Sequence, residues 1–281
     1  MKHLFYFIRK IIVFCIPLVL YFTANTIYKL QNDRYKKEVH GHEVYSSIEK
    51  SKKRTKIKKL IIGDSTANQL YNTESDTTSG IYTLACNQAI GMVGHFLLLN
   101  NYLKAGNRPE DVYLIYNPLG YWDNLDQIYT YHYFLKPFYK KEYKPFFTKT
   151  VIEQINKIPY YYICDLPPVY TSSWAPEKKD EKRNYTFLSP VSKEYLAKID
   201  SLSKAYVFNL HYVSPFVSKY WRDSINSFNI DETKGYSFTK DLNYYMKNIK
   251  YIDDSCFSDH LHLHNRNLIT YRNILDKEIG I

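Results

Sequence analysis

The stretch Leu60-Ile61-Ile62-Gly63-Asp64-Ser65 decides the fold of this chain, because it joins an apolar run to a glycine, an acid and a serine. A short apolar run that ends in glycine is typical of a buried strand. Gly63 has no Cβ and can adopt a positive φ, so we expect a sharp turn at this residue. Residues 66–70 then predict a helix. Ser65 is therefore expected at a helix N-terminus, where unpaired N–H groups favour developing negative charge.

A second motif, Asp259-His260-Leu261-His262-Leu263, lies near the other end of the chain and places an aspartate three residues before a histidine. A serine hydroxyl is a poor nucleophile until an imidazole takes its proton, and the imidazole needs a carboxylate to fix its tautomer. Ser65, His262 and Asp259 are therefore the candidate nucleophile, base and acid. The alternative is that Asp64 or Ser65 serves only as a helix N-cap, where both residue types are preferred.

The two motifs together resemble those of the SGNH (GDSL) hydrolase superfamily. That resemblance covers residues 58–281 and implies an α/β, flavodoxin-like parallel sheet sandwiched by helices. It also implies that Ser65, His262 and Asp259 form a catalytic triad.

The family's oxyanion hole is matched less completely. Its third block supplies an asparagine after a strand, and Asn117 follows the expected strand Val112–Tyr116 here. An Asn-Pro turn is also common for conformational reasons alone. The family's second block carries a glycine, and residues 84–90 contain none. Asn87 is the candidate replacement, because asparagine tolerates left-handed backbone angles.

Strands that alternate with helices predict a parallel sheet with helices on both faces. The carboxyl ends of such strands form the active site, so Ser65, Asn117 and the His262 loop are expected to converge there. The expected strands are Lys59–Ile62, Ile81–Ala85, Val112–Tyr116, Ala205–Asn209 and Ile249–Ile252. The expected helices begin at Ser65 and cover about 91–105, 192–204, 215–227 and 265–276.

The N-terminus predicts a membrane anchor. Ile11–Ala24 carries no charge and the run extends to Tyr28, about eighteen residues, which is enough to cross a bilayer core. Basic residues before the run favour a cytoplasmic N-terminus, although lysines after it weaken the asymmetry. A retained signal anchor is favoured over a cleaved signal peptide, because no small-x-small cleavage pattern follows. We therefore expect an anchor at 1–28, a basic juxtamembrane tether at 29–57 and an extracytoplasmic domain at 58–281.

Charge, cysteines and histidines exclude several classes of site. The net charge of +10 is spread along the chain without a nucleic-acid-binding motif, so no nucleic acid is expected. Four cysteines do not predict a disulfide framework. If the domain lies outside the cytoplasm, Cys164 and Cys256 could form a disulfide. Cys86 is interpreted as a buried residue. The alternating histidines at 260, 262 and 264 are an alternative metal site. No second ligand cluster accompanies them, so we expect neither metal nor cofactor.

Residues 120–190 form an insertion too long for an ordinary connection, and it is crowded with tyrosine, phenylalanine and tryptophan. Stacking of these rings on sugars is one interpretation, and docking onto a membrane partner is another. The 30 tyrosines of the whole chain also suggest a general compositional bias that needs no ligand.

An anchor joined to this triad resembles the accessory O-acyltransferases of cell-envelope biosynthesis. That resemblance implies that Ser65 takes up an acyl group, acetyl in the first instance, and passes it to a polysaccharide hydroxyl. The implied partners are a multi-pass membrane O-acyltransferase and a glycan acceptor. A carbohydrate or lipid esterase is the alternative enzyme, and a non-catalytic scaffold with a defective oxyanion hole is the alternative outside catalysis.

Overall fold

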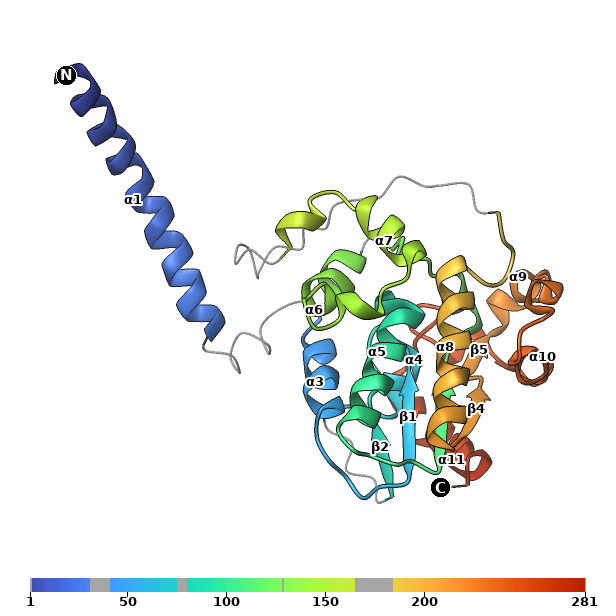
Figure 1. The fold of residues 1–281 in the computed structure, drawn as a ribbon. Helices are drawn as coiled ribbons and strands as arrows, with labels where there is room; N and C mark the ends of the chain where they lie inside the picture. Colours follow the sequence, from blue (N-terminus) through green and yellow to red (C-terminus); the bar gives the residue numbers. More distant parts are fainter. Residues whose placement is uncertain (1, 31–40, 75–79, 128, 165–183, 281) are drawn as a thin grey trace.

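The computed structural model describes residues 2–30, 41–74, 80–127, 129–164 and 184–280. A parallel sheet of four strands lies at the centre of the domain, with helices on both sides (Figure 1). Its strands are β1 (Lys59–Gly63), β2 (Ile81–Thr83), β3 (Asp111–Ile115) and β4 (Asn209–Val213). Their order is β2-β1-β3-β4, which matches the first four positions of the flavodoxin-like order. The predicted α/β class is therefore confirmed.

Two helices precede the first strand in the described part of the chain, and the others lie between or after the strands. They are α1 (Lys2–Leu30), α3 (His42–Ser51), α4 (Ser65–Leu70), α5 (Gly91–Lys104), α6 (Lys136–Phe138), α7 (Lys149–Asn156), α8 (Pro190–Tyr206), α9 (Arg222–Asn226), α10 (Thr239–Lys247) and α11 (Leu268–Glu278). A second, two-stranded parallel sheet consists of β5 (Phe216–Ser218) and β6 (Lys250–Ile252).

Side-chain alternation along β1 and β3 builds two cores, one on each face of the sheet. Leu60 and Ile62 point into the larger core, which includes buried residues of α5 and α8. Ile61 points into the smaller core, together with Leu70 of α4 and Leu275 of α11. Because successive strand residues face opposite sides, a strand buried on both faces is a continuous apolar run.

Gly63 is required for close packing of the strands. A Cβ on this residue would lie 2.1 Å from the carbonyl oxygen of Ile115 on β3 and 2.6 Å from the Cβ of Ala67 on α4. Gly63 is not among the residues with positive φ, so the expected left-handed turn is wrong. The glycine instead allows β3 and the first turn of α4 to approach the end of β1.

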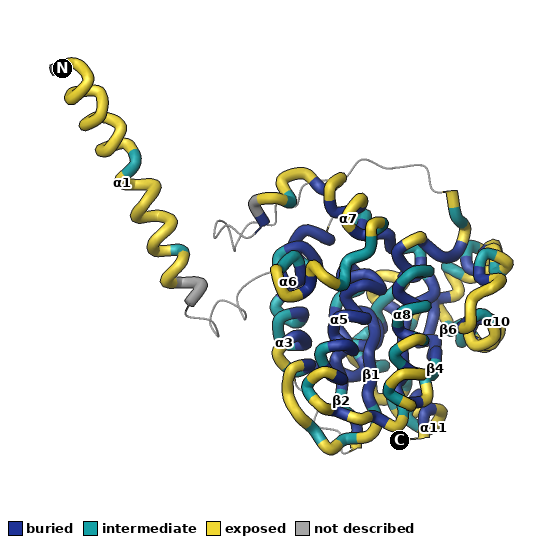
Figure 2. The backbone as a smooth tube through the Cα atoms, in the orientation of Figure 1, coloured by how far each residue is buried: buried dark blue, intermediate teal, exposed yellow. Residues whose placement is uncertain are grey.

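Helix α1 has the length and composition of a membrane span. Its segment His3–Ile27 is apolar over 25 residues, and none of the apolar window is buried against the rest of the chain. Figure 2 shows this helix as almost entirely exposed, in contrast to the buried centre of the domain. An exposed apolar helix of this length suits a lipid environment better than water.

The expected basic tether is partly structured. Residues 31–40 lie outside the described part of the chain, but His42–Ser51 forms helix α3. Val44 and Ile48, four residues apart on one face, are buried, and the helix packs against α5. The tether prediction is therefore wrong for this segment. Val44 and Ile48 are two apolar residues at helical spacing in an otherwise polar sequence, and they are enough to dock the helix on the domain.

Two further elements differ from the sequence prediction. Residues 205 and 206 continue α8, and the following strand begins only at Asn209. Val207 has a left-handed φ of 56° and ends the helix, a position where glycine is the usual signal. The helix expected at 215–227 begins instead as strand β5, which pairs with the distant β6, and only Arg222–Asn226 is α-helical.

The aromatic insertion contributes mainly to the larger core. Tyr121, Tyr131, Phe134, Phe138 and Tyr143 are all buried there. Burial of these rings supports the compositional interpretation of the insertion over a sugar-binding groove. Among its described residues, the large hydrophobic side chains that are exposed are Tyr129, Ile152, Tyr160 and Tyr162. Residues 165–183, including Trp174, lie outside the described part.

Candidate active site

The buried carboxylate of Asp64 joins the ends of β1 and β3. Its Oδ1 accepts hydrogen bonds from the backbone N–H of Thr66 at 2.9 Å and from the Thr66 hydroxyl at 2.6 Å. Its Oδ2 accepts from the backbone N–H of Asn117 at 2.7 Å. Burial raises the pKa of Asp64, and these hydrogen bonds lower it in part. Asp64 is thus the N-cap of α4, which leaves the Ser65 side chain available for another role.

Ser65, His262 and Asp259 form one hydrogen-bonded chain. The Oγ of Ser65 lies 3.0 Å from Nε2 of His262, and Nδ1 of His262 lies 2.8 Å from Oδ2 of Asp259. A carboxylate can only accept, so Nδ1 carries the proton and donates it to Asp259. The unprotonated Nε2 then accepts the hydrogen bond from the serine hydroxyl, which is the arrangement that a serine nucleophile requires.

The backbone also holds Asp259. Its Oδ1 accepts hydrogen bonds from the N–H groups of Leu261 at 3.0 Å and His262 at 2.6 Å. Burial by itself would raise the pKa of Asp259, but the hydrogen bonds from the side chain and backbone of His262 and from Leu261 outweigh it, so the pKa is lowered. The carboxylate therefore stays ionised and keeps the orientation of the imidazole.

Gln69 fastens the histidine loop to the helix that carries the serine. Its Nε2 donates to the carbonyl of Leu263 at 2.7 Å, and its Oε1 accepts from the N–H of Leu263 at 2.9 Å. Gln69 follows Ser65 by four residues on α4, so the two side chains share one helix face. The sequence prediction did not single out Gln69, although this spacing was the signal that could have found it.

Asn117, at the carboxyl end of β3, contributes a buried side-chain donor that has no partner in the described part of the chain. Its Oδ1 accepts a hydrogen bond from the N–H of Leu119 at 3.0 Å, which identifies the other side-chain atom as Nδ2. This Nδ2 is buried and has no partner in the described part of the chain. The side chain is 1% exposed, and its backbone N–H binds the carboxylate next to Ser65. A buried amide donor without a partner is costly unless a ligand uses it.

Asn87 is less suited to an oxyanion hole. Its backbone is extended, with φ of −73° and ψ of 142°, so the expected left-handed conformation is wrong. Its Oδ1 accepts from the N–H of Ala89 at 2.9 Å and caps a short 3₁₀ turn. The Asn87 side chain also hydrogen-bonds the carboxylate of Glu43 on α3. These contacts occupy the side chain for a structural purpose.

The site lies where the strand order reverses. The chain passes from β1 to its neighbour β2 on one side and then crosses to β3 on the other side, so β1 and β3 flank the switch point. Ser65 follows β1 and Asn117 follows β3, at the carboxyl ends of both strands. Ligands of open α/β sheets bind in the crevice at such a point.

The other reactive residue types are placed elsewhere. Cys86 is fully buried, and burial raises the pKa of its thiol, so the residue remains a packing group. Cys164 and Cys256 are both free thiols and do not pair. His260 stacks on Tyr220, and His262 alone of the three alternating histidines contacts Ser65. Within the described ranges, no group of three or more His, Cys, Asp or Glu side chains is arranged to hold a metal ion.

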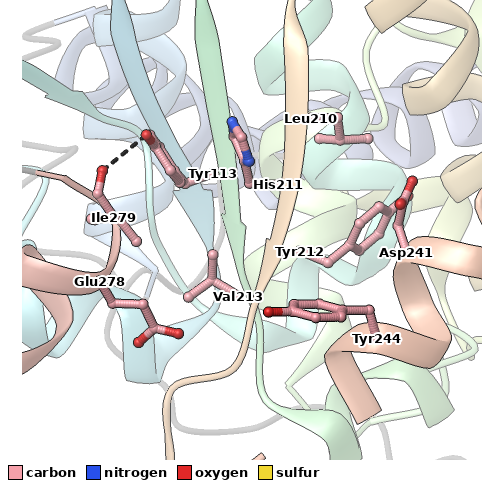
Figure 3. Close-up of a pocket in the computed structure, with 9 residues that line it drawn as sticks. All are labelled: Tyr113, Leu210, His211, Tyr212, Val213, Asp241, Tyr244, Glu278 and Ile279. Atoms are coloured by element: carbon pink, nitrogen blue, oxygen red, sulfur yellow. Dashed lines mark hydrogen bonds between the residues drawn. The ribbon is translucent and has the colours of Figure 1, made fainter. Parts of the chain in front are cut away.

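A cavity of about 260 Å³ opens along the free edge of the sheet, and none of the triad residues line it (Figure 3). His211 of β4 lies in its wall, stacks on Tyr113 at 4.8 Å and lies 2.9 Å from the carboxylate of Asp111. Burial would raise the pKa of Asp111, but hydrogen bonds from His211 and Asn209 lower it overall. This His–Asp pair contains no nucleophile and lies toward the amino end of β3, away from Ser65.

Neither a scan against protein-family models nor a search of curated proteins found a match to the chain. The chemistry of the site therefore follows from the arrangement of its own side chains.

Proposed function

We propose that the chain is a membrane-anchored serine acyltransferase. It moves an acyl group, for which acetyl is the favoured candidate, to a hydroxyl of an exported or cell-envelope polysaccharide. The observation that carries this proposal is the hydrogen-bonded chain from Ser65 through His262 to Asp259. The resemblance of both motifs to SGNH hydrolases supports ester chemistry. The apolar helix α1 supports work at a membrane, beside a multi-pass O-acyltransferase, with the domain on the extracytoplasmic side.

In the first half of the reaction, the Oγ of Ser65 attacks the carbonyl carbon of the acyl donor while Nε2 of His262 takes the hydroxyl proton. Asp259 stabilises the imidazolium that forms. The negative charge on the former carbonyl oxygen is stabilised by the N–H of Ser65, the first residue of α4, where backbone N–H groups have no intrahelical acceptor, and by Nδ2 of Asn117. Collapse of the intermediate expels the donor's leaving group, which takes the proton from His262, and leaves an ester on Ser65.

In the second half, Nε2 of His262 takes the proton of an incoming sugar hydroxyl, and the hydroxyl oxygen attacks the ester carbon. The second intermediate collapses by breaking the bond to Oγ of Ser65, which recovers its proton from His262. The products are the acylated sugar and the free enzyme. No metal or redox partner takes part in this sequence.

Hydrolysis is the second candidate, because the triad is open to water. The side chains of His262 and Asp259 are 33% and 54% exposed. Transfer requires that a sugar hydroxyl reach the ester before water does. If water wins this competition, the same residues form an esterase that releases the free acid.

The test uses the full chain in detergent micelles with p-nitrophenyl acetate and a fluorophosphonate probe. We expect Ser65 to react with the probe, and we expect Ser65→Ala to abolish labelling and to lower turnover at least about 10³-fold. His262→Ala should show a similar loss. The matched control is Ser201→Ala, because Ser201 is exposed on α8 and its hydroxyl bonds only the carbonyl of Ala197.

Full labelling of the Ser65→Ala chain would show that another residue is the nucleophile. A folded wild-type chain that the probe does not label would favour the scaffold alternative. Supplying a glycan acceptor then separates the two enzymatic candidates, because transfer yields acetylated glycan and hydrolysis yields acetate alone.

A further inference from the structure

A group of three rings, two of them exposed, adjoins the histidine loop. We call Tyr220, Trp221 and His260 the aromatic platform. The rings of Tyr220 and His260 stack with centroids 4.4 Å apart and an interplanar angle of 21°, and Trp221 meets Tyr220 edge-on at 4.9 Å. Tyr220 remains 59% exposed in spite of both contacts. His260 is exposed as well, whereas Trp221 is half-buried and packs against the larger core. The stacked pair Tyr220–His260 therefore offers aromatic surface to solvent, and Trp221 supports it from the side of the core.

Hydrogen bonds hold the aromatic platform in one arrangement. Nε1 of Trp221 donates to the carbonyl of His260 at 3.2 Å. The N–H of Tyr220 donates to Oδ1 of Asp254 at 3.0 Å, and Ser218 binds the same oxygen. His260 has a φ of 62°, a left-handed conformation that is unfavourable for a residue with a side chain. The contacts on both sides maintain this conformation, and it directs the His260 ring onto Tyr220.

The aromatic platform borders the triad through the chain itself. His260 directly follows Asp259 and precedes His262 by two residues, so its Cα lies within about 7 Å of the Cα of His262. The same five-residue loop thus supplies the acid, the base and one ring of the aromatic platform. A ligand resting on these rings would lie next to the imidazole that activates Ser65.

The chemistry of the aromatic platform fits a sugar ring. The face of an aromatic ring carries partial negative charge, which attracts the C–H groups on the flat side of a pyranose. Tyr220 carries a hydroxyl on its ring and His260 carries two ring nitrogens, and these polar atoms match the hydroxyl-covered edge of a sugar better than a hydrocarbon chain. An acyl chain or lipid would need a continuous apolar surface, and this small group of polar-tipped rings does not provide one.

We propose that the aromatic platform binds a pyranose unit of the polysaccharide acceptor and presents one of its hydroxyls to Nε2 of His262. This inference rests on the proposed function, and it identifies the part of the surface that favours sugar over water in the second half of the reaction. Tyr220 and His260 are then specificity-determining residues for the second half of the reaction, while the first half uses the triad and the oxyanion donors of Ser65 and Asn117.

The first experiment measures how the acyl-enzyme partitions among acceptors. The full chain in micelles turns over p-nitrophenyl acetate with methyl β-glucopyranoside or glycerol at equal hydroxyl concentration. We expect wild type to acetylate the pyranoside in preference to glycerol, which has hydroxyls but no ring. Tyr220→Ala and His260→Gly should lower this preference about tenfold. Glycine at 260 removes the ring and keeps the left-handed backbone.

The matched control is Tyr244→Ala, which removes an equally exposed tyrosine, 69% accessible, from α10. This variant should keep the wild-type preference. The inference is overturned if wild type shows no preference for the ring compound, or if Tyr220→Ala and Tyr244→Ala behave alike.

A binding experiment separates this inference from the proposed function. The Ser65→Ala chain, which cannot form the ester, is titrated with maltohexaose while tryptophan fluorescence is recorded. We expect a saturable change that Tyr220→Ala removes and Tyr244→Ala retains. Binding without any ester turnover in wild type would refute the acyltransferase proposal and keep the aromatic platform. If turnover depends on Ser65 but maltohexaose does not bind, the proposed sugar site is refuted and the proposed acyl transfer is not.

Discussion

At the scale of single residues, the candidate site depends on groups outside the Ser65–His262–Asp259 chain that hold its members in place. Asp64 and Gln69 both act in this way. Asp64 joins β1 to β3 through the N–H of Asn117, and Gln69 joins α4 to the backbone of Leu263. Since Ser65 and His262 are 197 positions apart in sequence, their 3.0 Å contact requires such bridges.

Gln69→Leu is expected to lower kcat for p-nitrophenyl acetate about 10- to 100-fold, since a small displacement of the base is enough to misalign proton transfer. KM should change little, because Gln69 is argued to act through the loop and not on the substrate. The control is Asn68→Ala on the same helix, which removes a hydrogen bond to Thr73 and none to the histidine loop. If both variants lose the same factor in kcat and also lose thermal stability, the effect of Gln69 is on folding and not on the position of the base.

At the scale of elements, α5 shows how the larger core tolerates polar groups. The helix is buried along nearly its whole length, and His95 at its centre is fully buried with both ring nitrogens lacking a partner in the described part. The ring contacts Tyr116 edge-on at 5.2 Å. Burial lowers the pKa of His95 to about 3 from its ordinary value of 6.5.

This shift predicts a pH-dependent stability. The folded chain keeps His95 neutral while the unfolded chain takes up a proton below pH 6.5, so stability falls as pH decreases from 6.5 toward about 3. The slope attributable to His95 is about 1.4 kcal/mol per pH unit inside this window. His95→Phe should remove that part of the slope and stabilise the fold by about 1 kcal/mol or more at pH 5. Urea unfolding of both chains at several pH values measures the difference. Parallel curves for the two chains would contradict it.

Sequence patterns predicted the elements whose signals are local. The apolar run before Gly63 predicted β1, and Val112–Tyr116 predicted β3 within one residue of each end. The patterns failed where distant pairing or an unusual cap decided the structure. Strand β5 exists because it pairs with β6, more than thirty residues later, and α8 ends at a left-handed valine that carries no helix-stop signal.

The same distinction applies to the candidate site. Short sequence motifs that are typical of serine hydrolases contain Ser65, His262 and Asp259. These residues could therefore be selected from the sequence alone. Gln69 has no such motif, and its contact with Leu263 depends on how α4 and the loop meet. Asn87 was selected for a backbone conformation that it does not adopt. Local conformational preference is a weak guide when a neighbouring helix, here α3, supplies a partner for the side chain.

At the scale of the whole molecule, one apolar helix precedes a domain whose polar site is built from both ends of the chain. The anchor and the domain are separated by residues 31–41, which can span at most about 40 Å when fully extended. A chain inserted through α1 would therefore keep the start of the domain at His42 within about 40 Å of the membrane-facing end of that helix. Such a tether is consistent with the proposed transfer from a membrane-bound donor, in which the acyl group would pass to Ser65 without meeting water.

The orientation of α1 is the last prediction. Lys2, Arg9 and Lys10 precede the uncharged run that begins at Ile11, and they favour a cytoplasmic N-terminus, which would place the domain on the opposite side. The exposed Lys141 provides a reporter position when it is changed to cysteine in a Cys256→Ser background. A membrane-impermeant maleimide should label this variant in intact, wall-stripped cells as fully as after lysis. The chain with Cys256→Ser alone is the background control, because its remaining cysteines lie in α1 or are buried. Labelling that appears only after lysis would place the domain in the cytoplasm, where an exported polysaccharide would not reach Ser65.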